Sequence, residues 1–186
     1  MHMEVDKKIV HCGGVLPARR SWDIGCGRPC RTHRRRSHSN ESRRRPSRGL
    51  CDFATRLFTA ALAGRALVNV QNPLQLTNYT EPEPDIVLLK VRSDDYRSKK
   101  VKSEDALLVL EISDTTLRYD SIVKALRYAA AGIPELWIEN LADNELIVLR
   151  NPSGSQYIER QTLHCGDTVS PLIFPGVYFQ VSELLG

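Results

Sequence analysis

The sequence predicts an α/β domain with a mixed central sheet flanked by helices, preceded by an irregular basic segment. Three stretches support this: the apolar runs PDIVLLK (residues 84–90) and ALLVLEIS (residues 106–113), and the helically periodic LRYDSIVKALRYAAAG (residues 117–132). Near-continuous apolar runs are typical of strands buried on both faces of a sheet that helices cover. The 186 residues are enough for one domain, or for one domain with an appendage.

Each of the two apolar runs carries one carboxylate near an end, Asp85 in the first and Glu111 in the second. An ionised carboxylate at the edge of a buried strand is costly unless a positive charge neutralises it. Mg²⁺ suits such a pair, because one or two carboxylates hold it while it keeps several waters. Strand alternation puts Glu111 and Ser113 on one face and Ile112 on the opposite one. The side chain of Ile112 can therefore stay in the core while its backbone carbonyl is a further candidate metal ligand.

Lys124 is the candidate catalytic cation, and it lies on the helix expected after the second strand. Residues 114–116 offer N-cap oxygens, and Gly132 with Pro134 marks the end of the helix. Asp120 and Lys124 are four residues apart and share one face, so Asp120 is a weaker site candidate. The expected buried stripe of this helix consists of Tyr119, Val123, Leu126 and Ala130.

A lysine beside a bound cation can orient or deprotonate the attacking water, or balance charge in the transition state. Each of these residues also has a structural interpretation. A strand-end aspartate is often a cap or a salt-bridge partner, and an Asp120–Lys124 pair alone is a surface ion pair of about 0.3–0.5 kcal/mol. The combination of Asp85, Glu111 and Lys124 is more specific than its members, and it indicates a nuclease core.

Three stretches resemble the Uma-type restriction endonucleases, a bacterial branch of the PD-(D/E)XK superfamily: PEPDIVLLK, LLVLEISDTTLRYDSIVKALRYAAAGIPELWIEN and SPLIFPGVYFQVSELL. The resemblance covers roughly residues 55–186. It implies a restriction-endonuclease-like fold and hydrolysis of DNA phosphodiesters with Mg²⁺, or with Mn²⁺ in its place. In it Asp85 matches the PD aspartate and Glu111 the glutamate. Lys124 matches a lysine displaced from the E-x-K position, here Ser113, onto the next helix.

The net charge of +4 conceals an asymmetry along the chain. Residues 18–48 contain eleven arginines against two acidic residues, a local net charge of +9, so the remainder sums to −5. Attraction to DNA would therefore depend on local patches of the mildly acidic domain. The candidate contacts lie in the charged connection of residues 92–105, where an ordinary solvated loop is the alternative; they are Arg97, Lys99, Lys100 and Lys102.

Residues 1–51 are rich in Arg, Ser, Pro, Gly and Cys and contain few large apolar residues. Such a sequence cannot form a core, so we expect disorder before a domain of residues 52–186. Three interpretations stay open. The segment is a basic arm that contacts phosphates, a small zinc site, or a stretch translated out of frame from a GC-rich gene. The zinc ligands would be Cys26, Cys30, His33 and His38.

The other expected elements follow from periodicity and turn residues. A helix is expected at residues 52–63, strands at 66–70, 74–77, 135–140, 145–150 and 156–161, and a short helix at 181–185. The inward face of the first helix is predicted to comprise Phe53, Leu57, Ala60 and Ala61, and Gln71 is interpreted as a satisfied core or turn amide.

The sequence thus predicts a Mg²⁺-dependent endonuclease that acts on DNA, and homodimers are compatible with cutting two strands. Its five cysteines, with neither a signal peptide nor an apolar run of about 18 residues, favour a reduced cytoplasmic protein without membrane contact. The alternative is a catalytically inactive nucleic-acid-binding module on the same fold.

Overall fold

The computed structural model describes residues 46–113 and 117–186. The basic arm up to residue 45, the candidate zinc ligands and the N-cap oxygens of residues 114–116 lie outside this part of the chain. Chain contacts divide the protein into Met1–Asn40 and Glu41–Gly186, and everything below concerns the second unit. Its helices are α1 (Pro46–Leu62), α2 (Leu117–Ala130) and α3 (Val181–Leu185), and a short 3₁₀ helix, η1, spans Ser103–Asp105.

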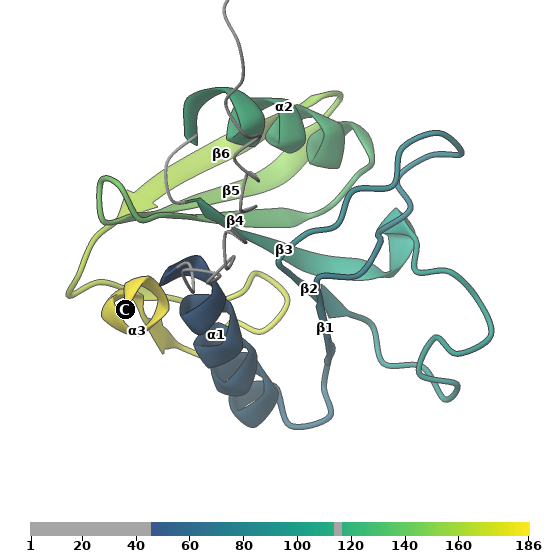
Figure 1. Ribbon diagram of the computed structural model, residues 1–186, viewed down its shortest axis with the longest axis horizontal. Coiled ribbons are helices and arrows are strands. Elements are labelled where there is room, and N and C mark those ends of the chain that lie inside the picture. The colour runs from purple at the N-terminus through teal and green to yellow at the C-terminus, as the bar shows by residue number, and fades with distance from the viewer. Residues whose placement is uncertain (1–45, 114–116) are drawn as a thin grey trace, which may run out of the picture. The chain divides into compact units, whose positions relative to one another are not determined.

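A sheet of six strands in chain order, β1 to β6, forms the centre of this unit. The strands are β1 (Leu67–Val70), β2 (Ile86–Leu89), β3 (Ala106–Ser113), β4 (Glu135–Asn140), β5 (Glu145–Ser153) and β6 (Gln156–Leu163). Only β3 and β4 pair in parallel, with α2 as their connection, and all other neighbours are antiparallel. Strands β7 (Thr168–Val169) and β8 (Phe179–Gln180) form a separate pair. The predicted mixed sheet is confirmed (Figure 1).

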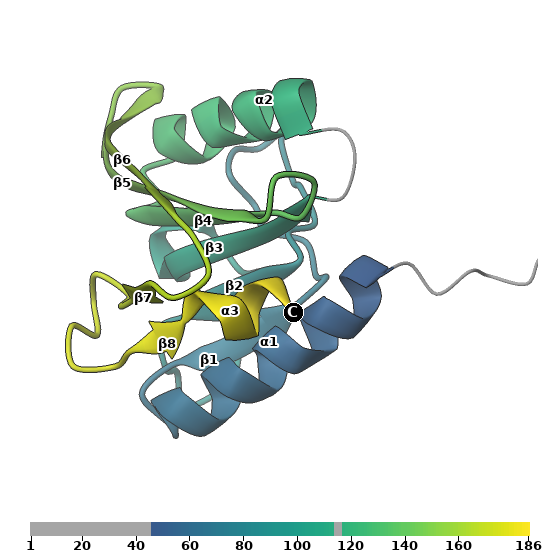
Figure 2. The ribbon, with the colours of Figure 1, turned by 90° about the vertical axis from the view of Figure 1, so that its left-hand side faces the viewer.

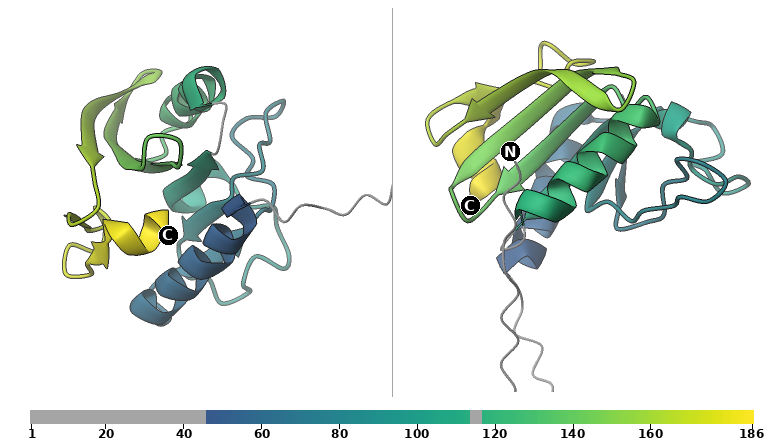
Figure 3. Two further views of the ribbon diagram at one scale, coloured as in Figure 1. Left: turned by 60° about the vertical axis from the view of Figure 1, so that its left-hand side comes forward. Right: turned by 90° about the horizontal axis from the view of Figure 1, so that it is seen from above.

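Helices cover both faces of the sheet, as the apolar runs predict. In Figure 2, α2 lies on one side of the strands, and α1 with α3 lies on the other; Figure 3, in its right-hand view from above, shows α2 running roughly along the direction of the strands. The side chains of β2 and β4 are accordingly buried along the whole length of each strand. Two hydrophobic clusters result, one on each face.

The buried face of α1 differs from the predicted one. The fully buried residues are Cys51, Ala54, Phe58 and Leu62; Leu57 and Ala61 of the predicted stripe pack against them half-buried, and Ala60 is exposed. Phe58 fixes this rotation, because its ring packs against Trp137 at 5.9 Å and Phe179 at 4.9 Å between centroids. The helix also begins at Pro46, so residues 46–51, which the sequence assigned to the irregular segment, are helical.

The buried face of α2 also differs from the predicted one, although the side chain of Tyr119 lies outside the described part of the structure. Tyr128 and Ala129 are buried, while Leu126 is 40% exposed and Ala130 is exposed. With the partly buried Ala125, the two buried residues have i, i+3, i+4 spacing, which is as helical as that of the predicted stripe, so periodicity alone could not choose between the two sets. The hydroxyl of Tyr128 has a partner on the sheet, which lets this polar aromatic residue occupy the inner face.

The predicted strand at residues 74–77 is absent from the sheet. This segment makes only isolated bridges, Gln75 with Lys102 and Thr77 with Thr80. Strand β1 ends at Val70, since Gln71 turns the chain with a left-handed φ of 48° and Pro73 has no N–H to donate. The strands predicted at 106–113 and 135–140 and the terminal helix at 181–185 are confirmed with the same bounds.

Candidate active site

Asp85 immediately precedes β2, at the end of the strand where it meets β3. The last paired residues there are Ile86 and Leu110, so Asp85 and Glu111 each lie one residue beyond this pair. Asp85 Oδ2 accepts the backbone N–H of Ile112 at 2.8 Å. Its carboxylate is therefore fixed against β3, directly beside the residue that carries the second carboxylate.

Glu111 lies near the end of β3 and is 7% exposed. Two residues of α2 hold its carboxylate: Lys124 Nζ is 2.9 Å from Oε2, and the Tyr128 hydroxyl donates to Oε1 at 2.6 Å. Lys124 and Tyr128 are four residues apart, so one face of α2 presents both groups. The side chain of Lys124 is 30% exposed, which leaves this edge of the site open to solvent.

The structure thus brings Asp85, Glu111 and Lys124 together, as their combination in the sequence predicts. Ile112 is held with them, because its N–H bonds to Asp85; its carbonyl as a metal ligand stays a prediction. Asp120 lies on α2, and its side chain is outside the described part of the structure.

The site concentrates negative potential. Burial raises the pKa of Glu111, Lys124 opposes the rise, and the charge of Asp85 adds to it. Burial and then Asp85 also raise the pKa of Glu139 to about 9 and that of Cys51 to about 11. One ionised aspartate therefore disfavours the ionisation of several buried neighbours, and a bound cation would relieve this repulsion.

The donor set fits a hard divalent cation of the Mg²⁺ type. Two carboxylates at the ends of adjacent strands are enough for Mg²⁺, which keeps most of its waters. Over residues 46–113 and 117–186, no cluster of three or more His, Cys, Asp or Glu side chains could hold a metal ion. A zinc site with four protein ligands is therefore not formed by this part of the chain.

Glu139 is a buried carboxylate that the sequence analysis passed over as part of an apolar strand. It is 0% exposed, and among the described residues neither of its oxygens has a hydrogen-bond partner. It pairs with Ile112 across β3 and β4. The signal for it in the sequence was its position in ELWIEN, one residue before the end of a buried strand. Strand alternation directs its side chain toward the face of the sheet that α1 covers.

Gln71 lies in the turn after β1 and contacts Asp85. It is exposed, and it bonds to Asp85 twice: its backbone N–H to the Asp85 carbonyl at 3.1 Å, and Nε2 to Oδ1 at 3.4 Å. A left-handed φ in a non-glycine residue costs free energy and often marks a functional position. Gln71 is thus a turn amide, as one of the two predicted roles has it, and it touches the site.

The candidate DNA-contacting cations lie on an exposed loop, and two of them already have acidic neighbours. Lys100 Nζ is 3.0 Å from each carboxylate oxygen of Glu81, and Arg97 is 3.8 Å from Asp95. Lys99 and Lys102 are exposed. The loop is therefore less basic at Lys100 than its sequence suggests.

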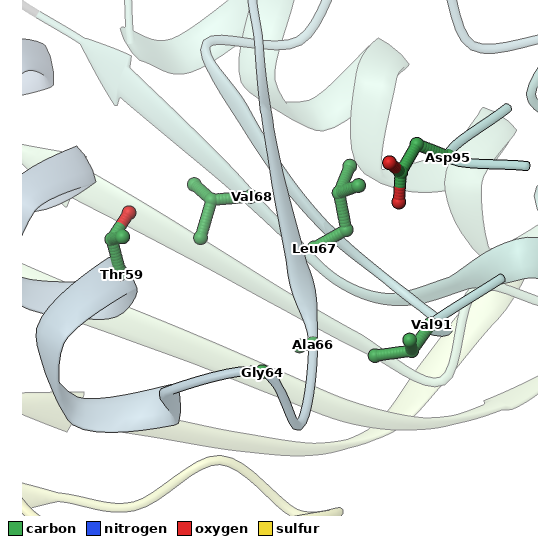
Figure 4. Close-up of a pocket in the computed structure, with 7 residues that line it drawn as sticks. All are labelled: Thr59, Gly64, Ala66, Leu67, Val68, Val91 and Asp95. Carbon is green, nitrogen blue, oxygen red and sulfur yellow. The ribbon is translucent and has the colours of Figure 1, made fainter. Parts of the chain in front are cut away.

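A pocket of about 310 Å³ lies away from these residues, between the end of α1, the start of β1 and the loop after β2 (Figure 4). Leu67 and Val91 line it, and Leu67 pairs with Leu89, at the end of the β1–β2 pair opposite Asp85. It contains none of the site side chains.

No helix within residues 46–113 and 117–186 is long and apolar enough to span a membrane.

Comparison with known proteins places the chain in a family and identifies a solved structure with the same fold. Residues 41–182 match the model of the Uma2 family, described as "Putative restriction endonuclease". A solved chain described as a putative nuclease belonging to DUF820, from Anabaena variabilis, has the same fold with a TM-score of 0.59 and 11% sequence identity. The alignment covers 75% of this chain and 79% of that one. A search of the curated proteins finds no match. Because the family match spans most of the sequence and includes Asp85, Glu111 and Lys124, this chain belongs to the Uma2 family of nuclease-like proteins.

Proposed function

We propose that this protein is a metal-dependent endonuclease that hydrolyses DNA phosphodiester bonds, with Mg²⁺ or Mn²⁺ as cofactor. The observation that carries the proposal is the convergence of Asp85 and Glu111 from adjacent strands with Lys124, 2.9 Å from Glu111. The Uma2 family description supports the same reaction class. A cytoplasmic location and a homodimer that cuts both strands complete the proposal.

Each residue has a distinct role in this mechanism. Asp85, Glu111 and the Ile112 carbonyl would hold the cation, which supplies Lewis-acid polarisation of the phosphate and a more acidic bound water. Lys124 orients the attacking water or balances the charge that develops on the phosphate oxygens. Its partial exposure leaves room for water at the reacting phosphate. Asp120 is proposed as a supporting acidic group on the same helix.

A cleavage assay tests the proposal. Purified protein is incubated with supercoiled, linear and single-stranded DNA in Mg²⁺, in Mn²⁺ and in EDTA. We expect cutting only with the cations, and a fall of about 10²–10³-fold in Lys124→Ala, the usual cost of removing one charge-stabilising group. Lys90→Ala is the matched control, since Lys90 Nζ bonds the Glu104 carbonyl at the other end of β2.

Cutting in EDTA, or undiminished cutting by Lys124→Ala, would contradict this mechanism. The rival, a non-catalytic nucleic-acid-binding module on the same fold, gives a different result. Its DNA binding would survive EDTA and fall steeply with salt, without any cutting.

The loop cations make a separate prediction about DNA affinity. Lys99→Ala and Lys102→Ala are each expected to reduce the slope of log K against log salt by about 1, since each removes one phosphate contact. Lys100→Ala is expected to change the slope less, because Glu81 already balances Lys100. Binding isotherms between low and moderate salt measure these slopes, and three equal changes would show that the Glu81 pair does not matter.

A further inference from the structure

Tyr128 occupies a position that the catalytic scheme does not use. It is fully buried on the inner face of α2, and its hydroxyl donates to Glu111 Oε1 at 2.6 Å. The other oxygen of the same carboxylate, Oε2, is held by Lys124 at 2.9 Å. Two residues on one face of one helix therefore hold the two oxygens of Glu111 separately.

This arrangement fixes the plane of the carboxylate. The terminal torsion of a glutamate is otherwise broad, so a single contact would leave the group free to rotate. An ionised carboxylate can accept about four hydrogen bonds, and Tyr128 and Lys124 leave acceptor capacity on both oxygens of Glu111. Partners of this kind orient metal-binding side chains, and their loss typically costs 10–100-fold in metal affinity or activity.

The chain offers a structural tyrosine for comparison. Tyr157 packs against the same hydrophobic cluster as Tyr128, and its hydroxyl donates to the backbone carbonyl of Ile133 at 2.9 Å. This hydrogen bond joins β6 to the connection between α2 and β4 and touches no carboxylate of the site. The two tyrosines share their chemistry and their cluster, and they differ in the group that each one holds.

We propose that Tyr128 is a positioning residue that fixes the Glu111 carboxylate for divalent-cation binding. This inference rests on the proposed function, because it concerns the same cation. A purely structural tyrosine would contribute packing and one satisfied hydroxyl. A positioning tyrosine also sets the affinity of the site for the cation.

The test measures Mn²⁺ binding to the full chain by calorimetry, without DNA, for wild type, Tyr128→Phe and Tyr157→Phe. Each substitution removes one hydroxyl and keeps the ring, so both variants are expected to fold with a lowered thermal midpoint. Tyr128→Phe is expected to raise the Mn²⁺ dissociation constant roughly 10–100-fold, and Tyr157→Phe to leave it unchanged. DNA cleavage by Tyr128→Phe should recover at high Mn²⁺ concentration.

The possible results separate the two proposals. Weaker Mn²⁺ binding in Tyr128→Phe alone, with recovery of cleavage at high Mn²⁺, supports the positioning role. Equal binding by wild type and Tyr128→Phe overturns that role and leaves the nuclease proposal standing. Equal weakening in both variants also overturns it, since it would reflect general loosening of the cluster. A wild type that binds no Mn²⁺ and cuts no DNA overturns both.

Discussion

Asp85→Asn is expected to reduce metal-dependent DNA cleavage about 10³-fold or more. A charge held at the metal contributes several kcal/mol to the transition state, and about 4 kcal/mol corresponds to a factor of about 10³ in rate. The substitution keeps the shape of the side chain. In the wild type, Asp85 accepts the Ile112 N–H at 2.8 Å. The asparagine carbonyl can still accept this hydrogen bond, so β2 and β3 should stay in register. Initial cleavage rates at saturating Mg²⁺ measure the effect.

The same variant should be no less stable than wild type in buffer without metal. The charge of Asp85 raises the pKa of Glu111 and of Glu139, so removing it relieves repulsion among buried acids. Loss of activity with retained or raised thermal midpoint would therefore identify Asp85 as a functional group that costs stability. Thermal unfolding in EDTA measures this.

Asp167→Asn is the matched control, because Asp167 also accepts a backbone N–H, that of His164 at 2.9 Å, in an exposed turn away from the site. It should cut DNA like wild type. If Asp85→Asn also cuts at the wild-type rate, Asp85 does not hold the cation and the mechanism is wrong.

Glu139→Met is expected to stabilise the protein by about 3 kcal/mol at pH 7. The pKa of Glu139 is raised from 4.5 to about 9, and each pH unit between 4.5 and 7 costs the folded state about 1.4 kcal/mol. Glu139 is buried without a partner in the described structure, and an apolar residue of similar length removes the cost of that burial. Chemical denaturation at several pH values measures the difference in unfolding free energy.

The gain should depend on pH in a defined direction. Burial raises the pKa of Glu139 from 4.5 to about 9 in the folded protein. The folded state therefore binds this proton more tightly, and wild-type stability from this group is fully present below about pH 4.5 and lost as pH rises toward 9. The advantage of Glu139→Met should be smallest near pH 4.5 and largest near pH 9.

Glu135 provides the contrasting residue on the same strand. It is equally buried, but it accepts from Arg150 Nε at 2.7 Å, from Trp137 Nε1 at 2.8 Å and from the N–H of Leu172 at 2.6 Å. Glu135→Met should destabilise by about 3 kcal/mol, because it leaves the guanidinium of Arg150 without its carboxylate. Equal effects at the two positions, or a Glu139→Met gain that does not change with pH, would show that Glu139 has an unrecognised partner.

The sequence predicts the strands best where burial is complete. Strands β3 and β4 have the predicted bounds because each is built around a run of buried apolar residues, 108–110 in β3 and 136–138 in β4, which is a local property of the sequence. The inner faces of α1 and α2 were predicted only in part, because both helices carry apolar residues on more than one face. Phe58 and Tyr128 settle those faces through partners that are distant in the sequence.

Some residues of the candidate site could likewise be predicted from the sequence, and others could not. Asp85, Glu111 and Lys124 were identifiable, because charged residues at the ends of apolar runs are costly unless they serve a purpose. The roles of Tyr128 and Glu139, and the hydrogen bond from Gln71 to Asp85, were not, since each depends on a contact, or on the lack of one, between separate elements.

By itself, the sequence determined the class of fold, the order of most elements and the three charged residues, since apolar run length and periodicity are local properties of the chain. The tertiary structure alone decided which helix faces are buried, how the oxygens of Glu111 are held, and that Glu139 lacks a partner among the described residues. Those features are set by packing across the sheet, where residues from distant segments compete for the same space and the same hydrogen bonds.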